Sequence, residues 1–356
     1  MENTKEFFNK KTVVSFVLSI LVVLIHLKAT NNYTLDGALG TAINSFSSIM
    51  CNCITPVAIR LFFIISGVLF YRNYTYKATL EKYKSRFKSL VVPYLIWCSL
   101  YTFLMMAIHY SPLGNMFEFD VPFSIHNLIM GVIFNVFYSS FWFIFNLIIF
   151  TLLCPVIYTL LKNKYVGAIV VIATIVLYCF GIMIPEMITI GGTEYVAFWR
   201  ADSIVFYLIG AYIGIHFFDF FAKKKNKAFS VISVFVMIAC VVYEFFRIKT
   251  GVDYKDGIRL IVMIIYCFSL WFAFDLFKYD KKPKGFCNYS FMMFALNFYI
   301  GAFLPQIIYM VLPKSQIFAL VNFGVTLVVE VVAIVLVSTI LDKKIHKLYA
   351  VLTGGR

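Results

Sequence analysis

Residues 12–29 read TVVSFVLSILVVLIHLKA, an apolar run interrupted only by small hydroxyl side chains, one histidine and one lysine. A helix needs about 20 largely apolar residues to cross a bilayer, because only a helix or a closed barrel pairs its own backbone polar groups in lipid. Further stretches of this kind lie at 51–71, 90–109, 141–161, 166–184, 203–221, 228–246, 259–277, 290–312 and 316–340. We therefore predict an all-α polytopic membrane bundle of about ten transmembrane helices.

The composition of the whole chain agrees with this prediction. Of the 356 residues, 62% are hydrophobic, 19% are aromatic and only 13% are charged. A soluble domain has about 25% charged residues, and one soluble core could not bury this much apolar side chain. The composition excludes a secreted globular enzyme, a disordered tail and a DNA-binding module.

The net charge of +14 reflects membrane topology rather than nucleic-acid binding. Lys and Arg in short loops favour the cytoplasmic side of a membrane. If the N-terminus is cytoplasmic, most of the 31 basic residues fall in segments that also face the cytoplasm, such as 72–88, 223–227 and 278–284. Both termini are therefore predicted to be cytoplasmic, with some attraction of the basic loops for anionic lipid.

The chain shows no linker, repeat or low-complexity tract. We predict one transmembrane domain over residues 1–356, with no appended soluble domain. The longest loop, 110–140, carries Glu118, Asp120 and His126, and its apolar stretch at 128–136 is expected to dip into the outer interface. The eight cysteines have no metal-site spacing, so neither a metal nor a bound cofactor is expected.

Ionisable side chains inside apolar spans are costly, and each one marks a candidate site. His26 ends the first apolar run, and Ser15 and Ser19 lie within about 20° of it on a helical wheel. The polar groups of this span therefore form a single stripe, which suits a polar cavity. A histidine bonded to a backbone carbonyl near the outer interface is the structural alternative.

Two further charged residues lie within predicted spans, Arg60 in the second and Glu330 in the tenth. A guanidinium cannot neutralise itself by losing a proton, so Arg60 needs an anion. That anion is either Glu330, in an ion pair that stabilises the bundle, or a phosphate or carboxylate of a ligand. Glu244, His216 and Asp275 fall near helix ends, where we expect them to reach water.

Four segments of the chain resemble the acyltransferase 3 family of ten-helix membrane proteins, which modify cell-surface glycans with acyl groups from acyl-coenzyme A. The run ending in His26 is similar to the family's hydrophobic run that closes on His. Residues 61–70, LFFIISGVLF, resemble its Phe-Phe-x-x-Ser-Gly-x-Leu signature. Residues 83–97, YKSRFKSLVVPYLIW, resemble its basic stretch leading into Pro-Tyr, and Trp142 and Phe143 with Pro155 resemble its Trp-Phe and downstream Pro.

The resemblance implies roles for individual residues. His26 matches the family's catalytic His, which takes the proton from the acceptor hydroxyl; imidazole suits this task because its usual pKa lies near neutrality. Lys84, Arg86 and Lys88 match the basic stretch and are expected to bind the phosphates of acyl-CoA. Ordinary cytoplasmic positive charge is the alternative for these three. Ser15, Ser19, Ser66, Arg60, Asn297 and Glu330 are expected to be supporting polar groups within the membrane.

The chain also departs from the family pattern. Ser15 stands where the family usually has Arg or Lys, and Arg60 stands where it often has Pro. Arg60 therefore suggests the hypothesis that a neighbouring helix restores the missing cation. Residues 289–297, YSFMMFALN, resemble the family's Ser-Phe-x-x-Tyr-x-x-His, but Asn297 replaces the His. An amide can orient a hydroxyl but cannot accept its proton.

The resemblance implies a membrane O-acyltransferase that moves an acyl group from cytoplasmic acyl-CoA, its cosubstrate, to a hydroxyl of a cell-surface or exported glycan. Acetyl is expected as the acyl group, with succinyl as the alternative. The implied partners are the lipid bilayer, acyl-CoA and a glycan or lipid-linked glycan, and the implied location is a bacterial plasma membrane. A non-catalytic exporter or flippase of a polysaccharide or lipid-linked intermediate is the second hypothesis, because Ser15 and Asn297 depart from the pattern.

Overall fold

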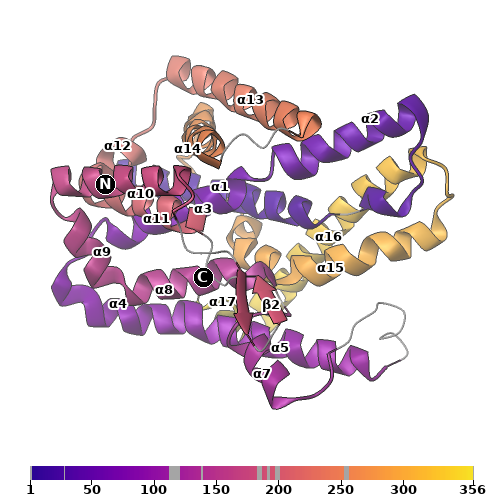
Figure 1. Cartoon of the computed structure of the whole chain (residues 1–356). Coiled ribbons are helices and arrows are strands. Elements are labelled where there is room, and N and C mark those ends of the chain that lie inside the picture. Colours follow the sequence, from indigo (N-terminus) through magenta and orange to yellow (C-terminus); the bar gives the residue numbers. More distant parts are fainter. Residues whose placement is uncertain are drawn as a thin grey trace. The chain divides into compact units, whose positions relative to one another are not determined.

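The computed structural model describes residues 2–27, 29–111, 121–137, 139–182, 187–190, 193–196, 201–251 and 256–355. These residues are mainly helical (Figure 1). Within the described ranges, strands are limited to one antiparallel hairpin of β1 (Met187–Ile190) and β2 (Thr193–Val196), in which Met187 pairs with Val196. The all-α prediction is confirmed, with this small hairpin as an addition.

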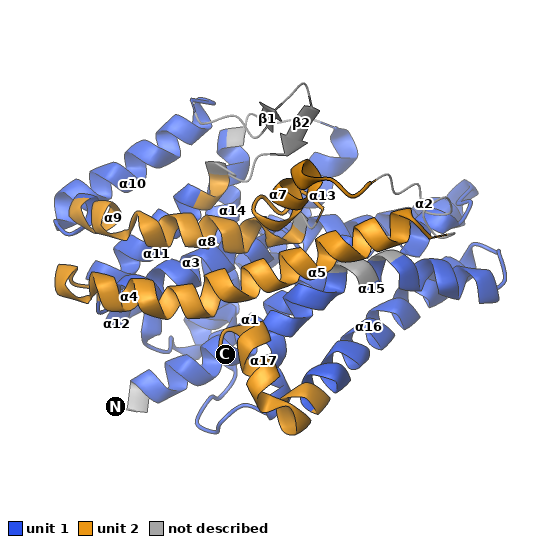
Figure 2. Ribbon diagram, turned by 90° about the horizontal axis from the view of Figure 1, so that it is seen from below, with its two compact units in different colours: residues 1–73, 160–182, 204–339 blue, residues 74–159, 183–203, 340–356 orange. Residues whose placement is uncertain are grey.

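The chain forms two compact units, drawn in blue and orange in Figure 2. Unit 1 contains Met1–Asn73, Leu160–Ile182 and Ile204–Thr339, and unit 2 contains Tyr74–Thr159, Met183–Ser203 and Ile340–Arg356. Each unit is built from segments that are distant in the sequence, so neither unit is a contiguous domain.

Unit 1 contains most of the long helices. Its elements are α1 (Glu2–His26), η1 (Ala29–Asn32), α2 (Gly37–Ser48), η2 (Ile49–Cys53), α3 (Val57–Tyr71), α10 (Lys164–Cys179), α11 (Ala201–His216), α12 (Phe218–Ala222), α13 (Lys227–Thr250), α14 (Asp256–Ala273), η6 (Phe274–Leu276), η7 (Gly285–Tyr289), α15 (Ser290–Val311) and α16 (Ile317–Lys344). The first residues of α11 and the last of α16 belong to unit 2.

Unit 2 contains shorter helices together with the β1–β2 hairpin. Its helical elements are η3 (Tyr76–Ala78), α4 (Thr79–Arg86), η4 (Phe87–Val91), α5 (Val92–His109), α7 (Ile125–Val132), η5 (Ser139–Phe141), α8 (Trp142–Leu152), α9 (Cys154–Leu161) and α17 (His346–Thr353). The last two residues of α9 belong to unit 1.

Six helical segments of the described chain are long and apolar enough to cross a membrane: Thr4–Asn32, Gly37–Tyr71, Tyr76–His109, Lys227–Thr250, Gly257–Leu276 and Ile317–Lys344. The pair α8 and α9, bent by 69°, makes a seventh if it is counted as one span. Lys164–Cys179 and Asp202–His216 are shorter apolar helices. The prediction of a multi-pass membrane protein is confirmed, whereas the count of ten spans and the side of the termini stay predictions.

Two segments differ from the predicted boundaries for clear local reasons. The stretch 141–161 is not one straight helix, because Pro155 has no backbone N–H and its ring crowds the preceding turn, and the helix axis breaks there. The expected loop 72–89 is largely helical, since α4 and η4 lead directly into α5.

The long loop 110–140 is also partly helical. It contains α7, whose first turn is capped by Ser124: its hydroxyl accepts a hydrogen bond from the backbone N–H of Asn127 (3.0 Å). Glu118 and Asp120 lie outside the described residues. The insertion of residues 128–136 into the outer interface stays a prediction.

The Ser66-Gly67 signature lies where α3 crosses α11 at close range. A Cβ atom at Gly67 would lie 2.5 Å from the backbone oxygen of Tyr207 and 2.7 Å from the backbone nitrogen of Ala211. On the facing helix, a Cβ at Gly210 would collide with the carbonyl group of Ile64. Small residues allow helix backbones to approach closely in membranes, so the glycine of the signature has a packing role here.

We expect Gly67→Ala to destabilise the protein by about 1–3 kcal/mol, because the added methyl group must displace backbone atoms rather than a flexible side chain. The matched control is Gly324→Ala, since a Cβ at this exposed helical position would contact nothing within 4 Å. The fraction of monodisperse protein that survives heating in detergent measures the difference. Equal heat resistance of the two variants would contradict the close crossing.

Glu244 and Asp275 do not reach water, contrary to our expectation. Glu244 is 0% exposed and accepts hydrogen bonds from Nε and Nη2 of Arg247 at 3.2 and 3.0 Å; Arg259 Nε lies 3.5 Å from its other oxygen. Asp275 is buried against Lys10, with 2.7 Å between Oδ1 and Nζ. The ion pairs offset the cost of burying these charges, and sequence position alone does not reveal the partners. His216 is half-buried, with Nε2 2.8 Å from the carbonyl oxygen of Leu161.

Candidate functional site

The polar stripe predicted on the first helix faces the interior of unit 1. Ser15 and Ser19 on α1 are buried, and Ser19 donates a hydrogen bond to the carbonyl oxygen of Phe16 (2.7 Å). His26, the last residue of α1, is half-buried. The two serines therefore lie on the buried face of α1, and His26 lies at the half-buried end of the helix.

Helix α15 runs beside α1 in the same direction. The ring of Phe286, just before α15, lies 5.3 Å from that of Phe16, and the ring of Tyr309, near its end, lies 4.9 Å from that of Tyr33. Asn297 lies about midway between these two contacts, and is therefore level with the second half of α1, which ends at His26. Its side chain is 0% exposed, and neither amide atom has a hydrogen-bond partner among the described residues.

Helix α16 presents Glu330 to α15. The Glu330 side chain is 0% exposed, and neither carboxylate oxygen has a hydrogen-bond partner in the described part of the chain. Both oxygens lie against Gly301, where a Cβ atom would be 3.4 and 3.5 Å from them. Most buried polar groups are paired, so unpaired ones call for an explanation. Asn297 and Glu330 are candidates for contact with a polar substrate.

Arg60 lies in the first turn of α3, just after Pro56. Its Nη1 donates to the carbonyl oxygen of Pro56 (2.8 Å), and its guanidinium lies 5.8 Å from the ring centre of Phe206. The ion pair with Glu330 that the sequence left open is not formed, because the Glu330 oxygens have no hydrogen-bond partner in the described residues. Ser66 is half-buried two turns further along α3.

Sequence reasoning found Glu330 but missed the polar row that leads to it. Asn322 and Thr326 precede Glu330 at intervals of four residues and lie on the same buried face of α16. Asn322 donates to the carbonyl oxygen of Pro305 (3.0 Å) and accepts from Thr326 (2.9 Å). The four-residue spacing of these polar side chains within an apolar run was the signal that could have identified the row.

In unit 2, the three basic residues of the matched stretch line one pocket of about 470 Å³. Lys84 and Arg86 come from α4, and Lys88 comes from η4, a single π-helical turn. Lys84 and Lys88 are exposed, and Arg86 is half-buried. The rest of the lining is mainly apolar and includes Tyr83, Phe87, Leu90, Val91, Ile148, Thr151 and Leu152. The volume lies within the usual range of small-molecule sites, about 300–1,000 Å³.

The π-helical turn follows from the sequence around Pro93. Proline has no N–H to donate to the carbonyl of residue 89, so the regular ladder is interrupted there, and η4 covers residues 87–91. Single π turns are frequent at functional sites. This turn brings Phe87, Lys88 and Val91 to the same pocket as α4.

The Pro-Tyr motif and the following Trp have structural roles in unit 2. The Tyr94 hydroxyl donates to the carbonyl oxygen of Ile133 (2.7 Å) and accepts from Asn135 Nδ2 (3.1 Å), which holds the chain after α7 against α5. Trp97 Nε1 donates to the carbonyl oxygen of Leu352 (3.0 Å), which fixes α17 on α5. These contacts fix α5, which directly follows η4, the π-helical turn that lines the pocket.

Most of the chain matches one family of known proteins. Residues 15–342 match the family model of acyltransferase 3, which is described as an acyltransferase domain. The match includes His26, Arg60, the basic pocket and Glu330. No match was found among the curated proteins or the solved structures.

Proposed function

The chain belongs to the acyltransferase 3 family, and we therefore propose that it is an integral-membrane O-acyltransferase. It would transfer acyl groups other than aminoacyl groups. The proposed reaction moves an acetyl group from cytoplasmic acyl-CoA to a hydroxyl of a cell-surface or exported glycan, in a bacterial plasma membrane. The observation that carries the proposal is the half-buried His26 at the end of a buried polar stripe. Asn297 lies level with the second half of this helix, and neither Asn297 nor Glu330 has a side-chain hydrogen-bond partner among the described residues.

In the proposed reaction, His26 takes the proton of the acceptor hydroxyl as its oxygen attacks the thioester carbonyl carbon. The carbon–sulfur bond then breaks, and the coenzyme A sulfur leaves with a proton returned by the imidazolium. The amide of Asn297 can hold a hydroxyl of the acceptor. Arg60 would stabilise negative charge that develops on the reacting oxygen; loss of acyl transfer in Arg60→Ala, with normal membrane insertion, tests this role.

The acyl donor is proposed to bind at the pocket of Lys84, Arg86 and Lys88. The pocket surface is apolar, and three basic residues border it, two of them exposed; this combination suits a ligand that has phosphates at one end and a largely uncharged arm at the other. Clustered ammonium and guanidinium groups bind phosphate oxygens through charge-assisted hydrogen bonds. Basic residues that serve only to set the membrane topology would not need to line a pocket.

Replacing both Arg86 and Lys88 by Gln is expected to raise KM for acyl-CoA about tenfold with little change in kcat, because the pair contributes to donor binding and not to the bond-breaking step. Lys77→Gln is the control, since Lys77 is exposed in η3 and does not line the pocket. Initial rates over a range of acyl-CoA concentrations give both constants. An unchanged KM in the double variant would mean that Arg86 and Lys88 only set the membrane topology and do not bind the donor.

The activity itself is tested with purified protein, labelled acetyl-CoA and glycan acceptors. Transfer of label to an acid-stable, base-labile ester on the glycan supports the proposal. In parallel, the surface polysaccharide of cells with and without the protein is compared for a missing ester. If label is never transferred and the polysaccharide is missing from the surface rather than unacylated, the exporter or flippase function is favoured instead.

A further inference from the structure

Unit 1 carries an aromatic groove that the proposed reaction does not use. The groove has a volume of about 410 Å³. It is lined by residues of α11, α12 and α14 and by Phe217, which connects α11 to α12: Tyr212, Ile213, Phe217, Phe220, Phe221, Phe268 and Phe272. Phe220 is 60% exposed, so the groove opens at the surface of the unit. Its volume and its apolar, aromatic lining are those of a ligand site, here one for an apolar chain.

Two lysines lie directly over rings that line the groove. Lys225 Nζ is 3.5 Å from the ring centre of Phe220 and 5.2 Å from that of Phe272. Lys164 Nζ is 5.1 Å from the ring centre of Phe217, another ring of the groove. Apolar rings and cations are therefore combined in one place, which is complementary to a molecule with an apolar chain and an anionic head.

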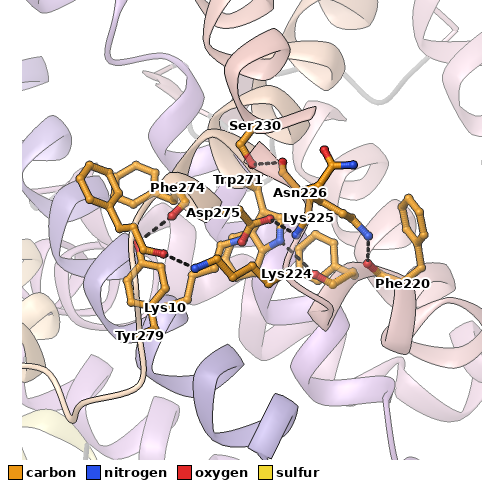
Figure 3. Close-up of polar contacts among 12 residues, drawn as sticks. Lys10, Phe220, Lys224, Lys225, Asn226, Ser230, Trp271, Phe274, Asp275 and Tyr279 are labelled. Atoms are coloured by element: carbon orange, nitrogen blue, oxygen red, sulfur yellow. Dashed lines mark hydrogen bonds and ion pairs between the residues drawn. The ribbon is translucent and has the colours of Figure 1, made fainter. Parts of the chain in front are cut away.

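The backbone of Lys225 is held by a hydrogen bond to Asp275, which in turn pairs with Lys10 (Figure 3). The buried carboxylate of Asp275 accepts hydrogen bonds from Lys10 Nζ (2.7 Å) and from the backbone N–H of Lys225 (3.2 Å). Lys10 Nζ also lies 4.1 Å above the ring centre of Trp271. Asp275 is thus paired with Lys10, and the Lys225 ammonium group instead donates to the carbonyl oxygen of Phe220 (2.6 Å), a residue that lines the groove.

The charge at the groove is incompletely balanced. Partial burial lowers the pKa of Lys225 from its ordinary value, Asp275 opposes this effect, and the neighbouring Lys223 adds to it. An anionic group next to Lys225 would relieve the repulsion between these lysines. Lys223, Lys225 and Lys164 belong to segments that the charge pattern of the sequence puts on the cytoplasmic side, where the membrane surface is anionic.

We propose that this groove is a binding site for an anionic phospholipid of the cytoplasmic leaflet, with an acyl chain against Phe217, Phe220 and Phe272 and the phosphate between Lys164 and Lys225. The site is separate from the acyl-CoA pocket, which belongs to the other unit, and the proposal does not depend on the acyltransferase reaction.

Native mass spectrometry of the full-length protein, titrated with phosphatidylglycerol and with phosphatidylcholine of the same acyl chains, tests the proposal. Wild-type protein should retain phosphatidylglycerol more tightly than phosphatidylcholine. Replacing Lys164 and Lys225 by Gln should weaken the binding of phosphatidylglycerol about tenfold, as expected for two cations near a lipid phosphate. The control replaces Lys224 and Lys227 by Gln, which removes the same charge from exposed positions whose ammonium groups do not contact the groove.

A second variant, Ile213→Trp, fills the groove and leaves every lysine in place. It should also weaken the binding of phosphatidylglycerol. This result would distinguish a lipid site from a general attraction of the surface for anions, because the variant keeps every lysine. The proposal would be overturned if the two double lysine variants lost phosphatidylglycerol binding equally, or if Ile213→Trp had no effect on this binding. Displacement of the lipid by inorganic phosphate at equal concentration would also overturn it, because the site would then recognise a soluble anion.

Discussion

Replacement of His26 by Ala is expected to reduce the rate of acyl transfer about 10²–10⁴-fold, the range usually lost with a general base. The loss should fall on kcat, with KM for acyl-CoA nearly unchanged, because the donor phosphates are proposed to bind in the pocket of unit 2. His26→Gln should be as inactive as His26→Ala, since an amide of similar shape cannot accept the proton. Initial rates of label transfer from acetyl-CoA to the glycan measure the effect.

The control for this experiment is His346→Ala. The His346 side chain, at the start of α17, is 74% exposed and pairs with Asp342 near the end of α16, so its loss should leave the rate within a factor of about two of the wild type. Both variants must give the same monodisperse elution and the same membrane yield as the wild type. Retention of more than a tenth of the activity in His26→Ala would mean that another group accepts the proton.

Replacement of Glu330 by Leu is expected to change stability and activity in opposite directions. An unpaired buried polar group costs about 1–3 kcal/mol, and Leu fills a similar volume without this cost, so the variant should be about 1–3 kcal/mol more stable. If Glu330 contacts a substrate, the same variant should lose at least about tenfold in acyl transfer, since binding sites retain such groups at the expense of stability. Heat resistance in detergent and initial rates give the two results.

Glu244→Leu provides the contrast, because Glu244 is equally buried but is paired with Arg247 and Arg259. Removing one partner of a buried ion pair leaves the other charge uncompensated and costs about 3–5 kcal/mol. We therefore expect Glu244→Leu to be less stable than the wild type. Loss of stability in both variants would show that Glu330 has a stabilising partner, such as Arg60, and would contradict the lack of a hydrogen-bond partner for Glu330 within the described ranges.

The candidate site was only partly predictable from the sequence. His26, Ser15 and Ser19 could be assigned to one face, because helical periodicity relates residues within a single helix. The pairing of Arg60 with Glu330 was left open, and it is not found, because contacts between helices depend on packing that periodicity does not report. The polar row before Glu330 was missed, although its spacing was visible.

The assignment as a multi-pass helical membrane protein of the acyltransferase 3 family could be made without a structure, because the length of an apolar run and the order of local motifs can be read along the chain. Which buried charges have partners depends on how the helices pack. Glu244 and Asp275 looked alike in the sequence as residues near helix ends, and for Glu330 the sequence left open whether Arg60 is its partner. Their states differ because a partner arrives from another helix, through contacts such as Arg259 to Glu244 and Lys10 to Asp275.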